Sequence, residues 1–146
     1  MIEITGLDAM RAKLNRLEEQ VRREFVVKAV KAGANVIRDA MIEDAPVLAA
    51  KSAGSNALEP GALRDDIKTR AHVDKDGVAV AHIGPSRKTG YVARFVEYGH
   101  REVKDNIEIG QVPPHSFLRP AFERSEAEAI ETFKSTMREE IAGELS

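Results

Sequence analysis

The 146-residue sequence contains no cysteine and no tryptophan, and only 5% of its residues are aromatic. The lack of cysteine excludes disulfides, thiolate nucleophiles and Cys-ligated zinc. The scarcity of aromatic side chains predicts a slim, helix-rich chain that completes its burial against copies of itself or against partners. No apolar run approaches the ~20 residues that span a bilayer, so we expect no membrane segment.

Charge is nearly balanced over the whole chain but not locally. The 22 basic and 24 acidic side chains leave a net charge of −2, which does not predict attraction of the whole molecule to nucleic acid. Residues 87–104 carry a net charge of +3, whereas residues 121–146 carry −4. Opposite charges on separate surfaces are suited to a head-to-tail contact between identical subunits.

The chain length fits a single domain, residues 1–146, and periodicity predicts an α+β fold. Residues 67–83 alternate as in a β-hairpin, with a two-residue turn at Asp76–Gly77. We expect a small, mainly antiparallel sheet that contains this central hairpin, packed by N-terminal helices and a long C-terminal helix. Apolar residues at helical spacing mark three long segments: Leu7–Val21, Phe25–Met41 and Leu118–Ile141.

The remaining segments are shorter or less regular. Ile2–Ile4 is expected to form a short strand, and Tyr91–Tyr98 a short helix that ends at Gly99. Its aromatic residues are expected to pack on the sheet. Residues 45–61 predict a long loop, and residues 100–116 an irregular segment with a possible short strand around Ile107 and Ile109.

Motifs that would indicate catalysis are weak. Gly84–Gly90 lies between a strand and a helix, but a phosphate loop needs Lys-Ser/Thr directly after its second glycine, and Tyr91-Val92 follow Gly90. We interpret residues 86–90 as a solvated basic loop, with weak anion binding at the helix start as the alternative.

Metal-dependent chemistry has equally little support. Glu102-Val103-Lys104 matches half of a metal-dependent nuclease site, but it has no obvious aspartate partner. A two-residue turn would place His72 and His82 on opposite faces of the hairpin, which disfavours a shared zinc site. The sequence therefore predicts no catalytic residue, no metal site and no cofactor.

Four blocks in a fixed order carry a resemblance to a known family. They are Asp44–Val47 after a long helix, Gly61–Ile67 before the hairpin, Tyr91–Gly99 after it, and Pro113–Phe122 at the start of the last helix. This order resembles the HK97 gp10-like family of tailed-bacteriophage tail-completion, neck or head–tail joining proteins. The sequence departs from the family pattern by a longer segment before Gly61, by Asp66 where Ser is common, and by His100 where Thr often stands.

The resemblance implies a structural virion protein without enzyme activity. It would form a ring, of six subunits or alternatively twelve, at the head–tail interface, after assembly in the host cytoplasm. Its expected partners are copies of itself, neck adaptor or stopper proteins and the tail-tube protein, with DNA passing through the lumen without sequence-specific binding and no membrane. The alternative is a nucleic-acid-binding module that uses Arg64, Lys68, Arg70, Arg87 and Lys88.

Two sets of residues follow from this interpretation. The family-motif and packing residues are Pro46, Gly61, Leu63, Tyr91, Phe95, Glu97, Tyr98, Gly99, Pro113, Pro114, Phe117, Leu118 and Pro120. The candidate contacts with neighbouring subunits or partners are Leu48, Leu58, Arg87, Lys88, Arg94, Arg101, Val103, Val112, Glu126 and Glu131.

Overall fold

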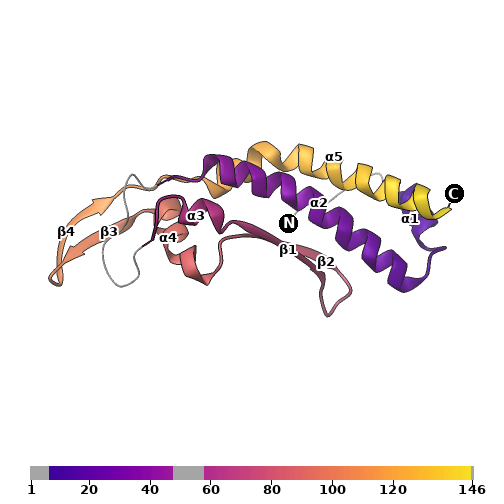
Figure 1. The fold of residues 1–146 in the computed structure, drawn as a ribbon, viewed down its shortest axis with the longest axis horizontal. Helices are drawn as coiled ribbons and strands as arrows, with labels where there is room; N and C mark the ends of the chain where they lie inside the picture. The colour runs from indigo at the N-terminus through magenta and orange to yellow at the C-terminus, as the bar shows by residue number, and fades with distance from the viewer. Residues whose placement is uncertain (1–6, 48–57, 146) are drawn as a thin grey trace. The chain divides into compact units, whose positions relative to one another are not determined.

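A computed structural model describes residues 7–47 and 58–145. The chain divides into two compact units. The first unit comprises residues 1–37, 69–82 and 125–146, and the second comprises residues 38–68 and 83–124. In chain order the elements are α1 (Asp8–Leu14), α2 (Glu19–Asp44), α3 (Ala62–Asp65), β1 (Lys68–Val73), β2 (Ala79–Gly84), α4 (Arg87–Tyr98), β3 (His100–Lys104), β4 (Ile107–Val112) and α5 (Leu118–Leu145) (Figure 1).

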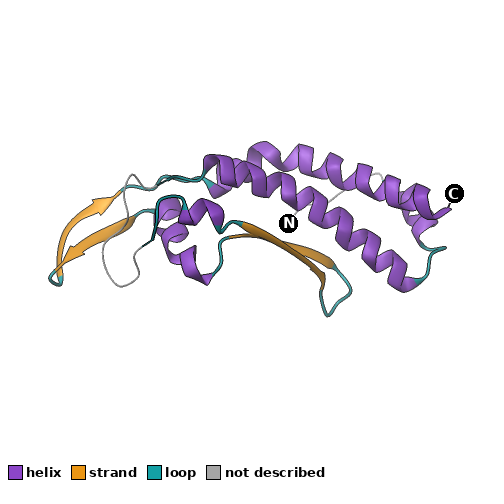
Figure 2. Ribbon diagram, viewed as in Figure 1, coloured by secondary structure: helices purple, strands orange, loops and turns teal. Residues whose placement is uncertain are grey.

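The expected α+β class is confirmed, with a difference in the sheet. Figure 2 shows helices together with two separate β-hairpins in the described part of the chain. The pairs are β1 with β2 and β3 with β4, so the strands do not join into one sheet. The expected strand at Ile2–Ile4 lies outside the described residues, as does Leu48.

Within the first unit, α2 and α5 lie side by side (Figure 1). Ala29, Met137 and Ile141 form a buried core between them. A Cβ atom on Gly33 would lie 2.7 Å from the carbonyl oxygen of Ala129, so the absence of a side chain permits the close approach of the two helices. The partly buried residues around this core are Met10, Leu14, Phe25, Val26 and Phe133.

The expected helix over Leu7–Val21 is interrupted. The helix α1 ends at Leu14, and the N–H of Leu17 donates to the Leu14 carbonyl in a turn before α2 begins at Glu19. The apolar stripe therefore continues in space across two helices, which is why the periodicity alone did not reveal the break.

The hairpin of β1 and β2 confirms the predicted strands but not the predicted turn. The N–H of Asp74 donates to the Val78 carbonyl at 2.8 Å, so three residues form the loop, with Gly77 at φ 79°. An additional loop residue shifts the pairing by one and reverses the facing of one strand. His72 and His82 consequently lie on one face and stack, with ring centroids 5.4 Å apart, so their expected separation is wrong.

Residues 100–116, expected to be irregular, contain a second hairpin. Its two turn residues, Asp105 and Asn106, both have positive φ, of 52° and 63°, as a type I′ turn requires. The register runs from His100 opposite Val112 to Lys104 opposite Ile107, with a bulge near Val103. Asn and Asp tolerate this conformation better than other non-glycine residues, which explains their position between the strands.

Candidate interaction surface

The helix α4 buries a different face from the one predicted. Thr89, Ala93 and Glu97 are buried, whereas Tyr91, Phe95 and Tyr98 are exposed, Tyr98 at 76%. The expected packing of these aromatic residues on the sheet is therefore wrong. Tyr91 and Phe95 instead contact one another edge to face on the outer side of the helix, with centroids 6.2 Å apart.

Glu97 explains why α4 turns a carboxylate inward. Only 7% of Glu97 is exposed, and its carboxylate accepts hydrogen bonds from the N–H groups of Phe117 at 2.8 Å, Leu118 at 3.0 Å and Arg119 at 3.2 Å. The Ser116 hydroxyl donates to it at 2.5 Å. These are the unpaired N–H groups at the start of α5, where a negative charge is favoured. A residue of one sequence block thus caps the helix that begins in another.

The electrostatics of Glu97 follow from these contacts. Burial alone would raise the pKa of its carboxyl group, because burial disfavours the charged form. The hydrogen bonds from Ser116 and from the three N–H groups outweigh this effect and hold the pKa below its ordinary value of 4.5. Glu97 is therefore ionised, and its carboxylate is fully hydrogen-bonded within the fold.

The start of α4 is organised by a second carboxylate, Asp66. Its Oδ2 atom accepts hydrogen bonds from the Ser86 hydroxyl at 2.6 Å, the Ser86 N–H at 3.0 Å and the Thr89 hydroxyl at 2.8 Å. The hydrogen bond from the Ser86 hydroxyl is the main reason that the pKa of Asp66 is lowered. Residues 87–90 belong to the first turn of α4 rather than to the expected basic loop. Because Asp66 supplies an anion there, the structure gives no support to anion binding at this helix start.

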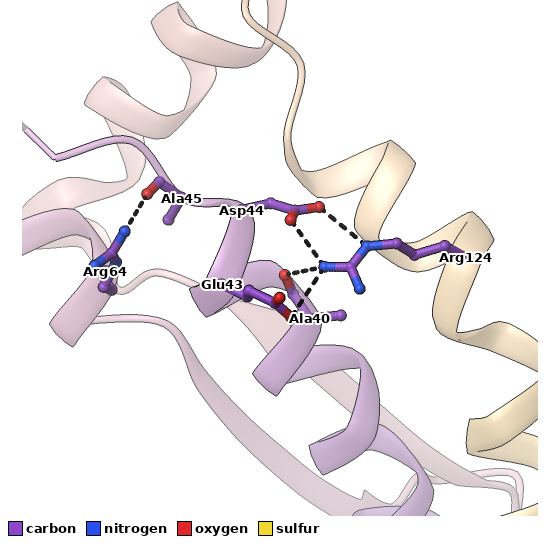
Figure 3. A network of polar contacts seen from close by, with 6 residues as sticks. All are labelled: Ala40, Glu43, Asp44, Ala45, Arg64 and Arg124. Atoms are coloured by element: carbon purple, nitrogen blue, oxygen red, sulfur yellow. Dashed lines mark hydrogen bonds and ion pairs between the residues drawn. The ribbon is translucent and has the colours of Figure 1, made fainter.

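Two arginines hold the last turn of α2 and the residue that follows it (Figure 3). Arg124 donates to the Asp44 carboxylate at 2.8 Å and to the Ala40 carbonyl at 3.2 Å. Arg64 donates to the Ala45 carbonyl at 3.0 Å. Arginine side chains commonly satisfy the last carbonyl groups of a helix. These contacts could not be predicted from the sequence, because neither arginine has a recognisable spacing relative to Asp44.

Several motif residues meet in the second unit. An apolar cavity of about 220 Å³ is lined by seven of the predicted residues: Pro46, Leu58, Gly61, Leu63, Phe95, Val112 and Pro113. Leu58 is only 7% exposed, so its assignment as a contact with partners is wrong, and it belongs to the core. Phe117 and Leu63 are also buried, while Leu118 is half-buried.

Glycine and proline residues of the motif define the ends of elements. Gly61, at φ 85°, precedes α3, and Gly99, at φ 74°, follows α4. A Cβ atom on Gly99 would lie 2.6 Å from the Val112 carbonyl oxygen and 2.9 Å from the Pro114 nitrogen. Pro120 lies in the first turn of α5, where its missing N–H costs no hydrogen bond.

Apolar side chains are exposed mainly on one part of the second unit. Of the nine large apolar residues exposed in the described part of the chain, seven lie between Tyr91 and Val112. We call these seven residues the apolar band: Tyr91, Phe95, Tyr98, Val103, Ile107, Ile109 and Val112. Both strands of the second hairpin are almost wholly exposed, and a two-stranded hairpin is marginally stable alone. The apolar band therefore has the composition of a surface that another molecule covers.

The predicted charged contacts are exposed, with one exception. Arg87, Lys88 and Arg94 lie on the outer side of α4, and Glu131 lies on the outside of α5. Glu126 is half-buried. Arg101, on β3, is exposed and forms an ion pair with Glu108 at 3.6 Å.

The basic residues of the alternative nucleic-acid site are only partly available. Arg64 is half-buried and bound to Ala45, and Lys68 pairs with Asp66 at 3.6 Å. Arg70 is exposed, as are Arg87 and Lys88.

The described residues form neither a metal-holding cluster nor a membrane-spanning helix. Within residues 7–47 and 58–145, no group of three or more His, Asp or Glu side chains is arranged to hold a metal ion. Glu102 and Lys104 lie in β3, both exposed, on a hairpin rather than in a cleft. No described helix is long and apolar enough to cross a membrane.

The match to a known family covers the first three of the four motif blocks. Residues 8–99 match the family described as "Bacteriophage HK97-gp10, putative tail-component". No curated protein and no solved structure matches the chain. The chain belongs to the HK97 gp10-like family of phage tail components.

Proposed function

We propose that the protein is a non-enzymatic structural component of a tailed-phage particle, which forms a ring at the head–tail interface and completes the tail. The general assignment of the protein as a phage tail component follows from its family. The ring and its location at the neck are the proposed part, with six subunits expected and twelve as the alternative. Neck adaptor or stopper proteins and the tail-tube protein would be its neighbours, and DNA would pass through its lumen.

The observation that supports this proposal is the apolar band. Seven large apolar side chains exposed on α4 and on the two faces of the second hairpin would be unfavourable in a chain that functions alone in water. Burial of a single side chain such as Ile107, 66% exposed, contributes about 1.5–3 kcal/mol. A closed ring would bury this surface once for every subunit.

A test of this proposal separates folding from incorporation. The variant has three substitutions, Val103→Ser, Ile107→Ser and Ile109→Ser, and the control is Val78→Ser, at an apolar residue that is also exposed. We expect near-normal thermal unfolding for both proteins, because neither removes buried surface. The triple variant should be lost from purified particles, whereas the control should be retained.

The location of the chain is tested by electron microscopy of particles labelled with an antibody to it. We expect label at the junction of head and tail, and particles lacking the protein should accumulate as separate heads and tails. Label along the tail tube or at the distal tip would reject the neck location. Incorporation of the triple serine variant at the wild-type level would reject the apolar band as an assembly surface.

A further inference from the structure

We infer that the outer face of α4 binds the acidic face of α5 in a second copy of this chain. This inference rests on the proposed ring and identifies the two surfaces that would meet in it. On α4 the surface is a shallow groove of about 690 Å³, lined by Arg87, Gly90, Tyr91, Arg94, Phe95, Gly99 and His100.

The outer face of α4 combines cations with aromatic rings. Arg87, Lys88 and Arg94 are exposed, and none forms an ion pair with any described residue. The carboxylate of Glu97, on the same helix, is buried and accepts hydrogen bonds at the start of α5, so it forms no ion pair with these cations. Tyr91 lies one turn from Arg87 and one turn from Arg94, so an apolar centre is flanked by positive charge.

Two properties of this face favour a protein over a nucleic acid. Tyr, Phe and Arg are enriched at protein–protein interfaces, and the groove continues at His100 into the exposed hairpin. The apolar band contributes nothing to phosphate binding, whereas a protein partner would cover it. A partner for the cations should then carry exposed carboxylates next to small side chains.

The helix α5 of the same chain has such a face, with one exposed cation, Arg138, at its edge. Glu128, Glu131 and Glu139 are exposed and lie within about 80° of one another around the helix. Ser135, also exposed, lies midway between Glu131 and Glu139 and leaves space for a ring. Glu131 forms an ion pair with the half-buried Lys134 at 3.8 Å, which is a weak contact because the Glu131 side chain is 70% exposed.

The basic residues on α4 and the acidic residues on α5 have similar separations along their helices. Arg87 and Arg94 are separated by about 10 Å along α4, and Glu131 and Glu139 by about 12 Å along α5. With these two pairs in contact, Tyr91 would lie over Ser135. The contact joins different surfaces of the two copies, so it repeats from subunit to subunit, as a ring requires.

The test uses two charge-reversed proteins that should each fail alone and succeed together. One protein carries Arg87→Glu and Arg94→Glu, and the other carries Glu131→Arg and Glu139→Arg. A matched control, Arg11→Glu with Arg16→Glu, makes the same change in net charge at exposed residues near α1. Self-association of the full chain is measured by sedimentation velocity at low salt over a range of concentrations.

We expect each reversed protein to associate about 100-fold more weakly than the wild type, because two close charge pairs become repulsive. The equimolar mixture should recover wild-type association, since each mixed contact again joins opposite charges. The control should associate normally. Carbodiimide treatment of mixed ¹⁴N- and ¹⁵N-labelled wild-type chains should link Lys88 of one copy to Glu128 or Glu131 of another.

Three outcomes would overturn the inference. They are a wild-type chain that remains monomeric at every concentration, a mixture that does not recover association, and association that the reversals leave unchanged. Salt-sensitive binding of duplex DNA by the monomer, lost with Arg87→Glu and Arg94→Glu, would assign the face to nucleic acid instead. The proposed neck location is judged separately from particle labelling, so it can survive the loss of this particular contact.

Discussion

The Oε2 atom of Glu97 lies 2.8 Å from the backbone nitrogen of Phe117, the buried residue that immediately precedes α5. This contact crosses from the part of the chain that matches the family, residues 8–99, to a part outside the match. It also fixes the end of α4 relative to the start of α5 within the second unit. The consequences of removing it can be measured.

The first prediction is that Glu97→Gln lowers the free energy of unfolding by about 3 kcal/mol, because buried N–H groups lose a charged acceptor. An amide has one oxygen, and its NH₂ group would face donors. Urea unfolding followed by circular dichroism measures the change. The matched control is Glu102→Gln, at an exposed hairpin residue, which should change stability by less than about 0.5 kcal/mol. Equal effects of the two substitutions would show that Glu97 does not stabilise the start of α5.

The second prediction concerns pH. The folded pKa of Glu97 lies below the ordinary value of 4.5, so its stabilising contribution is complete above that value. The contribution is lost as the pH falls through the folded pKa, where the carboxylate takes up a proton. The difference in unfolding free energy between wild type and Glu97→Gln should therefore be constant from pH 7 to about 5 and shrink below 4.5. A difference that grows on acidification would contradict the assigned direction.

The third prediction compares two helical glycines. Gly90→Ala should raise stability by about 0.5–1 kcal/mol, because alanine favours the helix and its Cβ meets no atom within 4 Å. Gly33→Ala should lower stability by about 2 kcal/mol, because its Cβ would lie only 2.7 Å from the Ala129 backbone oxygen. Thermal unfolding shows whether each substitution raises or lowers the stability of the protein. If Gly33→Ala raised stability, α2 and α5 would pack less closely than described.

The fourth prediction concerns the end of α4. Gly99→Ala should destabilise the protein by about 3 kcal/mol, since positive φ and a contact with the Val112 carbonyl both oppose a side chain. Gly77→Ala is the control, because Gly77 has a similar φ of 79° but open space around it. Its cost should be about 1 kcal/mol, from the backbone conformation alone. Equal costs at the two positions would argue against the close approach of β4 and Gly99.

The parts of the fold that follow from periodicity were predicted well. The apolar repeat from Leu118 to Ile141 predicted the long helix α5, and alternation from residue 67 to 83 predicted the first hairpin. Periodicity does not count turn residues, so the prediction missed the extra loop residue before Val78. That single residue also reversed the expected relationship between His72 and His82.

The surface was predicted less well, for a physical reason. A helical pattern shows which residues share a face but not whether that face is buried, and the aromatic face of α4 is the exposed one. The inward face is selected by the N–H groups of α5, which need the carboxylate of Glu97. Of the second hairpin, only a short strand around Ile107 and Ile109 was expected, because the turn signal of Asp105 and Asn106 was not recognised.

The exposed second hairpin has a consequence for the free protein. Within residues 7–47 and 58–145, no third strand pairs with either outer edge of this hairpin, so the edges can pair with another extended chain. Arg101, Glu102, Lys104 and Glu108 place charge of both signs along these strands, and the bulge beside Val103 distorts the edge. Such features slow indiscriminate edge-to-edge aggregation. The same hairpin that would bind a neighbouring subunit therefore also carries charges that limit aggregation before the chain is incorporated. Neutralising these charges would shorten the time for which the unassembled chain stays in solution.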